Sequence, residues 1–133
     1  MGILVRRLEE ADRKERAYTE RRRMAHSTAQ LQLEGILDSI PTWLAELLVP
    51  IDNLTRRNSL IEVEIRGRQL QLEGRIEDRS KPVVILRFAG KDAGRVERHR
   101  VHGWVATWTR GDKRFRKPFR QDILERMLAD VLA

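Results

Sequence analysis

The sequence predicts an α+β fold. It comprises a long N-terminal helix, a short second helix, an antiparallel meander of four to five strands, and a C-terminal amphipathic helix packed on the sheet. Residues 3 to 40 contain one glycine and no proline, apolar and polar residues alternate between residues 60 and 118, and apolar residues recur at helical spacing after residue 119. The length of 133 residues suits a single modest core. We expect a helical arm over residues 1–40 and an α+β core domain over residues 41–133.

Charged residues dominate the first part of the N-terminal helix. Acid-before-base pairs at i,i+4 stabilise an exposed helix, and the arm has three of them: Glu9–Arg13, Glu10–Lys14 and Asp12–Arg16. A 4,3 spacing joins Leu4, Leu8, Ala11, Tyr18 and Ala25, but Glu15 and Arg22 interrupt this seam. A better apolar stripe follows: Ala29, Leu33, Ile36, Leu37 and Ile40. We therefore expect the second half of the helix to dock on the core, and the first half to project or meet a partner chain.

A short second helix is expected after residue 40. Ser39 is a suitable N-cap and Pro41 suits a first helical turn. Its apolar face would comprise Trp43, Leu44, Leu47 and Leu48, and Pro50 would end it. Residues 51–54 then read as a turn or a further helical turn, and residues 56–59 as a loop. We expect Trp43 to be a core residue.

Alternating residues predict the strands. Ile61, Val63 and Ile65 form one half-buried strand, and Leu70, Leu72 and Ile76 form the next, with a tight turn at residues 66–68. Residues 83–88 are apolar on both faces, which indicates a central strand covered on both sides. Residues 90–94 read as a loop. A strand that begins between Val96 and Val101 runs to Thr109, and a short strand follows at residues 114–117.

The C-terminal segment is the clearest amphipathic helix in the chain. Its apolar stripe comprises Ile123, Leu124, Met127, Leu128, Val131 and Leu132. Acidic and basic residues fill the other side. We expect this helix to close the core over one face of the sheet.

One segment accounts for the charge of the whole chain. Residues 95–120 carry nine Lys or Arg against two acids, and this excess of seven equals the net charge of the protein. Basic residues interleaved with aromatic ones are typical of a polyanion-binding surface. The candidate nucleic-acid-binding residues are Arg98, Arg100, Trp108, Arg110, Lys113, Arg114, Arg116 and Lys117. The same pattern would also suit the solvated hairpin of a small sheet.

The two tryptophans of this segment have two interpretations. Trp104 and Trp108 lie four residues apart on one face of the predicted strand. On a solvent-facing sheet, Trp108 or Phe115 would stack on bases. If a helix covers this face, both tryptophans would instead be buried in the core, as large aromatic residues usually are. The open faces of the first two strands carry Glu62, Glu64 and Glu73, so a polyanion should bind near residues 110–117.

Several classes of function are disfavoured. The chain has no cysteine, which excludes disulfides and thiolate metal sites and favours an intracellular, cytoplasmic location. No apolar run is long enough to span a membrane. His99 and His102 would point to opposite faces of a strand, so we expect no metal site and no cofactor. No phosphate loop, nucleophile motif or zinc-protease motif is present, so we expect a binding protein and not an enzyme.

Two functions remain open. In the first, the protein is a small binding module that binds single- or double-stranded nucleic acid through the Arg-rich hairpin 95–120. In the second, it is a protein–protein adaptor or inhibitor, of the kind that mobile elements encode. It would then dock on an acidic partner surface or form a homodimer through its N-terminal helix. Nucleic-acid binding should weaken steeply with salt, whereas binding through apolar arm residues should not.

Overall fold

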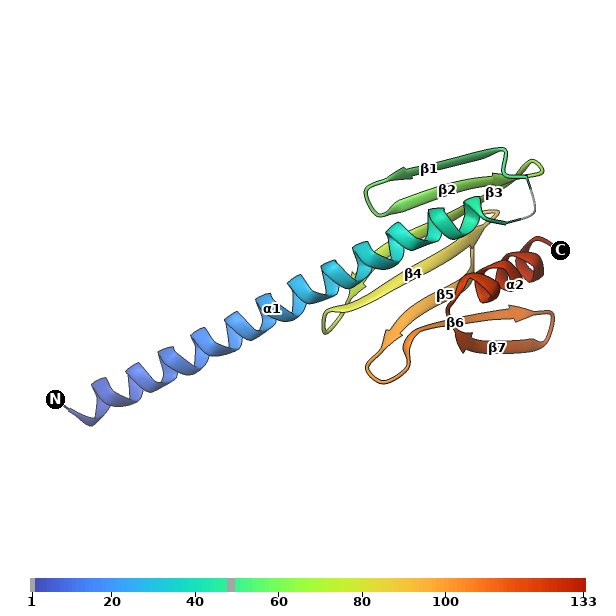
Figure 1. Ribbon diagram of the computed structural model, residues 1–133. Helices are drawn as coiled ribbons and strands as arrows, with labels where there is room; N and C mark the ends of the chain where they lie inside the picture. The colour runs from blue at the N-terminus through green and yellow to red at the C-terminus, as the bar shows by residue number, and fades with distance from the viewer. Residues whose placement is uncertain (1, 48–49) are drawn as a thin grey trace.

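The computed structural model describes residues 2–47 and 50–133. It confirms the α+β class, with two helices and one antiparallel sheet (Figure 1). The sheet has seven strands, so the expectation of four to five was too low. In chain order the elements are α1 (Ile3–Ala45), β1 (Asn53–Arg57), β2 (Leu60–Ile65), β3 (Arg68–Glu77), β4 (Lys81–Phe88), β5 (Lys91–His99), β6 (Gly103–Arg110), β7 (Lys113–Pro118) and α2 (Gln121–Leu132).

The N-terminal helix is longer than predicted and absorbs the expected second helix. α1 continues through Pro41 to Ala45, so the prediction of a separate short helix was wrong. The proline removes one backbone hydrogen bond, but Leu37, Ile40 and Leu44 are each fully buried. This burial on both sides of Pro41 outweighs the lost bond. Leu48, assigned to the same apolar face, lies outside the described residues.

The strands follow one another in chain order across the sheet, from β1 at one edge to β7 at the other. Tight turns explain this simple meander. The predicted turn after β2 has Arg66 and Gly67 at positive φ, and Ala89 and Gly90 repeat the pattern between β4 and β5. Two successive residues at positive φ match the right-handed twist of an antiparallel hairpin. Each turn therefore returns the chain directly beside the strand it has just left.

Two strands, β1 and β5, were missed by the sequence analysis. Residues 51–54 and 56–59 were expected to be a turn and a loop, and residues 90–94 a loop, because they lack apolar alternation. The strand expected to begin between Val96 and Val101 begins at Gly103, and residues 96–99 belong to β5. β1 is an edge strand whose apolar contribution to the core is the half-buried Leu54, and β5 contributes one buried side chain, Val96. A β-bulge near the C-terminal end of β4, between Leu86 and Arg87, shifts the register of β5 and obscures the pattern further. Pairing with β2 and β4, rather than local propensity, makes these segments strands.

Both helices cover the same face of the sheet (Figure 1). The second half of α1 lies over β3 and β4, and α2 lies over β5 and β6. The expected stripe of α1 is buried, as are Ile123, Leu124, Met127 and Leu128 of α2. Trp43 is half-buried and meets the ring of Phe119 edge-on, with 5.5 Å between centroids. The predicted boundary at residue 40 falls inside α1.

The opposite face of the sheet has no helix. Val83 and Ile85 of β4 point to this face and yet are 0% and 4% exposed. Register places Arg75 and Glu97 beside Val83, and Glu73 and Arg95 beside Ile85. The aliphatic parts of these long charged residues cover the strand. β4 is therefore buried on both faces, as predicted, although side chains do the covering on this face. We call this surface the polar face.

α1 projects far beyond the sheet. Every described residue before Ala29 is exposed, so the free arm of residues 3–28 is about 40 Å long (Figure 1). No described helix has an apolar stretch long enough to cross a lipid bilayer.

Candidate nucleic-acid interface

The basic residues of the hairpin gather on the last strand of the sheet. β7 pairs with β6 on one side only and ends the strand order, so its outer backbone groups face outward. The turn at Gly111 and Asp112 pairs Arg110 with Lys113 and sets the register of the hairpin. Four exposed cations follow along β7: Lys113, Arg114, Arg116 and Lys117. We call these four residues the basic edge.

Strand alternation divides the basic edge between two surfaces. Arg114 and Arg116 pair with Thr109 and Thr107, and all four side chains lie on the polar face. Lys113 and Lys117 lie on the side of the helices. Residues two apart on a strand are about 7 Å apart. The two arginines therefore form a spaced pair of planar donors that can each hold a different phosphate group.

A shallow groove of about 800 Å³ lies on the polar face beside Arg114 and Arg116. Its floor includes Ile85, Ala93 and Gly94, and the hydroxyls of Thr107 and Thr109 belong to its lining. His99 also lines it and has Nε2 3.4 Å from Arg116 Nη2. The groove lining thus combines guanidinium, imidazole and hydroxyl groups, which are a suitable set for phosphate oxygens, with the carboxylates of Asp92 and Glu97.

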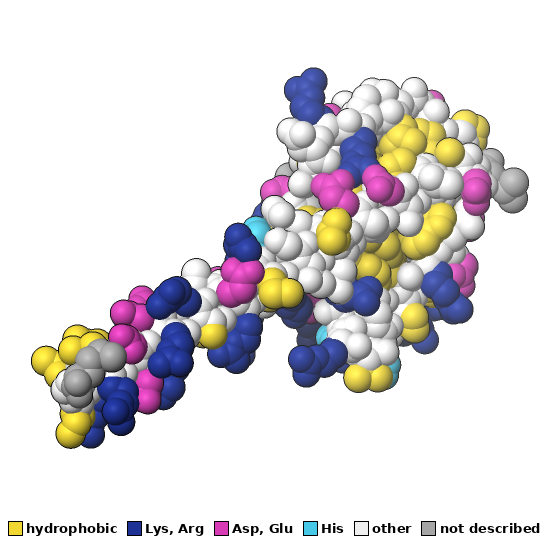
Figure 2. Space-filling view, turned by 60° about the vertical axis from the view of Figure 1, so that its left-hand side comes forward, with side chains coloured by type: hydrophobic (Ala, Val, Ile, Leu, Met, Phe, Trp, Pro, Cys, Tyr) yellow, Lys and Arg dark blue, Asp and Glu magenta, His cyan; other side chains and the backbone are white. Residues whose placement is uncertain are grey.

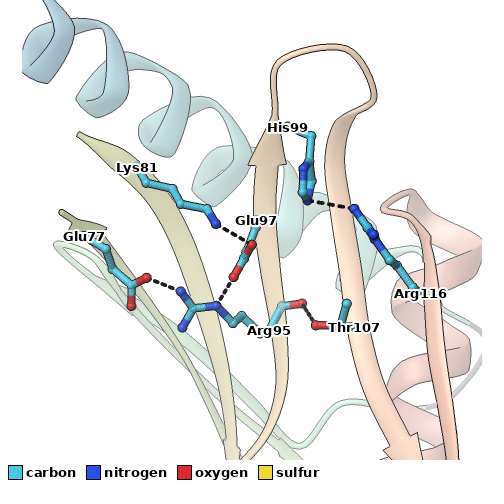
Figure 3. A network of polar contacts seen from close by, with 7 residues as sticks. All are labelled: Glu77, Lys81, Arg95, Glu97, His99, Thr107 and Arg116. Carbon is cyan, nitrogen blue, oxygen red and sulfur yellow. Dashed lines mark hydrogen bonds and ion pairs between the residues drawn. The ribbon is translucent and has the colours of Figure 1, made fainter. Parts of the chain in front are cut away.

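The other wall of the groove is electrically neutralised (Figure 3). Arg95 bridges Glu77 and Glu97, and Lys81 Nζ reaches Glu97 Oε2 at 2.6 Å. Partial burial raises the pKa of Glu97, but the hydrogen bonds from Lys81 and Arg95 outweigh this effect, so the pKa lies below its usual value. The hydrogen bond to Glu77, partly offset by burial, raises the pKa of Arg95. These cations are already bound to carboxylates and are poorly placed to bind a ligand.

The basic edge differs from this network in having no acid partner. Among the described residues, none of its four cations lies within 4 Å of a carboxylate oxygen. Arg87 on β4, by contrast, is shared between Glu73 and Asp92. Arg116 is in contact with His99 alone in the network of Figure 3. Four unpaired cations therefore lie together on one edge strand of the sheet.

The remaining predicted basic residues are dispersed. Arg110 belongs to the turn end of the hairpin and approaches Asp130 of α2 at 3.7 Å. Arg98 is half-buried and pairs with Trp104 on the helix side of the sheet. Arg100 is exposed in the turn between β5 and β6, at the other end of the strands. The structure thus brings Arg114 and Arg116 together at the groove and leaves Arg98, Arg100 and Arg110 outside it.

Trp108 belongs to the core and not to an open stacking platform. Its side chain is 3% exposed, and its ring stacks on Phe115 with 5.3 Å between centroids. Its Nε1 donates a hydrogen bond to Asp130 Oδ2 at 2.8 Å. α2 covers this face of β6, so a base cannot reach the ring. The assignment of Trp108 to the binding site is therefore corrected, and the core interpretation holds. Trp104 is half-buried against the same core.

Sequence reasoning missed four residues around the basic edge. Thr107, Thr109 and His99 line the groove, and Arg126 of α2 lies over the ring of Phe115, 5.1 Å from its centroid. A signal for the two threonines was present, because a two-residue turn at Gly111-Asp112 pairs them with Arg116 and Arg114. No local pattern announces His99 or Arg126, because β5 and α2 are brought to β7 by the tertiary fold.

Charge changes sign across the polar face. Glu62 and Glu64 lie on β2 at the far end of this face, as expected, where they and Arg87 line a smaller pocket of about 260 Å³. The described residues offer no group of three His, Asp or Glu side chains placed to hold a metal ion. Comparison with protein-family models, curated proteins and solved structures gave no match to this chain. Its chemistry is therefore inferred from its own residues.

Proposed function

We propose that the protein is a non-enzymatic module that binds nucleic acid through the basic edge and the adjoining groove. The observation that carries this proposal is that Lys113, Arg114, Arg116 and Lys117 lie together on one edge strand, with no carboxylate within 4 Å among the described residues, beside the ion-paired network of Arg95. Lysine and arginine that neutralise phosphates release counterions, which supplies most of the affinity for a polyanion. Arg114 and Arg116 would hold successive phosphates, and the hydroxyl of Thr109 would donate to their oxygens.

The site supports backbone contacts more than base recognition. Among the described residues that line the groove, the aromatic rings of Trp108 and Phe115 are buried or half-buried. Stacking of bases on these rings is therefore blocked. Phosphate contacts position a nucleic acid without reading its sequence. We accordingly expect similar affinities for oligonucleotides of different sequence, with a strong dependence on salt.

The proposal is tested by fluorescence anisotropy of labelled single-stranded and duplex oligonucleotides over a range of salt concentrations. The double substitution Arg114→Ala, Arg116→Ala removes two phosphate contacts. It should lower the slope of log K against log salt by about 1.4 for a single strand and about 1.8 for a duplex. The fold should persist, because both side chains are exposed.

A matched control is available toward the opposite edge of the sheet. Arg57 of β1 and Arg68 of β3 are exposed and make no ion pair among the described residues. The pair Arg57→Ala, Arg68→Ala removes the same charge but leaves the basic edge intact, so its slope should stay close to that of the unaltered protein. An equal decrease of the salt slope in the two double variants would mean general charge attraction and would contradict a localised site.

A second candidate function follows from the free edge of β7. An unpaired edge strand can accept an extended peptide as an additional strand, and Lys113 and Arg114 would favour an acidic one. This adaptor function predicts binding of an acidic peptide that survives near-physiological salt while oligonucleotides are released.

Basic residues on an edge strand also prevent edge-to-edge aggregation, a role that needs no ligand. In that case neither probe would bind above the level of the control variant.

A further inference from the structure

The free arm of α1 exposes apolar residues that the rest of the chain does not cover. Ile3, Leu4 and Leu8 are 71%, 71% and 55% exposed, and Tyr18 is 58% exposed. Figure 2 shows hydrophobic side chains gathered at the free end of the arm. Most helix stability in proteins comes from packing of an apolar face rather than from propensity. The arm therefore lacks the packing that its second half finds on the sheet.

The exposed residues continue the stripe that packs on the sheet. At 100° per residue, Leu4, Leu8, Ala11 and Tyr18 fall on the same side of α1 as the buried residues Ala29, Leu33, Ile36 and Ile40. Ala25 borders this stripe, and the charged residues Glu15 and Arg22 occupy the remaining positions of its 4,3 spacing, which is the spacing of a helix that pairs with another helix. Met24, by contrast, lies on the far side of the helix. A partner helix is therefore expected on the Leu4–Leu8–Tyr18 side.

The charges of the arm select the orientation of that partner. Residues 9–12 carry Glu9, Glu10 and Asp12, and residues 21–23 are three arginines. A second copy in parallel orientation would place each block beside the identical block of the other copy, so that like charges would face each other. A second copy in antiparallel orientation, centred between residues 16 and 17, places each acidic block beside a basic one.

The apolar stripe is compatible with the same register. In that alignment Leu8 lies opposite Ala25 of the second copy, Ala11 opposite Arg22, and Tyr18 opposite Glu15. Large side chains thus meet small ones, and the tyrosine hydroxyl meets a carboxylate. Leu4 lies opposite Ala29, the first buried residue of α1, where the partner arm enters its own core. The exposed length of the arm therefore matches the length that this register uses.

From these three coincidences we infer that the arm is an antiparallel homodimerisation helix, in which residues 4–28 of two copies pack along each other. The occupant of the exposed stripe is a second copy of this chain. The inference does not depend on nucleic-acid binding, because it uses no residue of the basic edge.

Disulfide trapping tests both the partner and the register, since the chain has no cysteine of its own. Single variants Leu8→Cys and Ala25→Cys are prepared from the full chain and oxidised separately and as a mixture, without nucleic acid. The mixture should yield a covalent dimer of twice the 15.6 kDa of one chain, and each variant alone should yield several-fold less. In the parallel arrangement Leu8→Cys would cross-link to itself, which would overturn the inference.

Met24→Cys is the matched control, because Met24 is 61% exposed but lies on the opposite side of α1. Its mixture with Leu8→Cys should give no more dimer than the single variants. Equal cross-linking with Met24 and with Ala25 would mean random collision and would overturn the proposed register. Sedimentation of the unaltered protein at tens of micromolar should give the mass of a dimer. A monomer mass there would overturn the inference altogether.

Discussion

At the scale of single residues, ion pairing decides which charged groups are free to bind. Glu97 accepts hydrogen bonds from Lys81 and Arg95, and Arg95 is shared with Glu77 (Figure 3). These four side chains lie over the buried β4 strand and neutralise one another. Arg114, only two strands away, has no such partner among the described residues. Two arginines of the same sheet therefore have different roles, one structural and one available to a ligand.

Glu97→Gln should destabilise the fold in a pH-dependent way. The carboxylate of Glu97 has a lowered pKa in the folded state, so its contribution is present above the usual glutamate pKa of about 4.3 and is lost as pH falls through the folded value. At pH 7 we expect a loss of about 1 kcal/mol in the free energy of unfolding. Urea unfolding of both proteins at pH 7 and pH 3 measures this loss. If the two free energies of unfolding differ more at pH 3 than at pH 7, this account is contradicted.

At the scale of elements, the contact between α1 and β3 depends on a missing side chain. Gly74 faces α1, and a Cβ atom there would lie 3.0 Å from Cδ1 of both Leu33 and Leu37. A methyl group there would require both leucine side chains to shift within a closely packed core. The close approach of helix and sheet therefore explains why a glycine stands within an otherwise regular strand.

Gly74→Ala and Gly35→Ala should change stability in opposite directions. Gly74→Ala overpacks the helix–sheet contact and should cost about 1–3 kcal/mol. Gly35 lies within α1, where an added Cβ atom would meet nothing within 4 Å, so Gly35→Ala should gain about 1 kcal/mol through helix propensity. Midpoints of urea unfolding report both changes. A loss of stability in Gly35→Ala would mean that the outer side of α1 is packed against another surface.

At the scale of the whole molecule, the chain divides into a core and a projecting arm. The two helices and the sheet bury one continuous cluster from Leu33 to Leu128, whereas residues 3–28 are exposed throughout. Folding of the core thus owes nothing to the packing of this first part of α1. Association, if the arm pairs as inferred, adds stability only as protein concentration rises.

Removal of residues 2–24 should separate folding from association. The truncated chain should still unfold cooperatively, because it retains every buried residue of α1. The thermal midpoint of the full chain should rise by about 2–4 °C for each tenfold increase in concentration, through coupling to dimerisation. The midpoint of the truncated chain should not move. Differential scanning calorimetry at several concentrations measures both, and the same concentration dependence in both chains would locate association in the core instead.

The sequence by itself determined the elements whose burial repeats with a regular period. Three apolar repeats each predicted a buried face within a single element, and all three predictions are confirmed. They are the stripe from Ala29 to Ile40, the alternation of β2 and β3, and the stripe of α2. The concentration of charge in residues 95–120 was equally visible, because it is a matter of composition.

Only the tertiary structure decided the rest. β1 and β5 are strands because neighbouring strands bond to them, and α1 passes Pro41 because both sides of it are buried. The same holds for the candidate site: helix α2 takes Trp108 into the core, and strand alternation separates Arg114 and Arg116 from Lys113 and Lys117. Local patterns indicate which side chains are buried and which face solvent. They do not indicate which distant segment buries a given side chain. Contacts between distant segments therefore determine which cations remain free at the edge of the sheet.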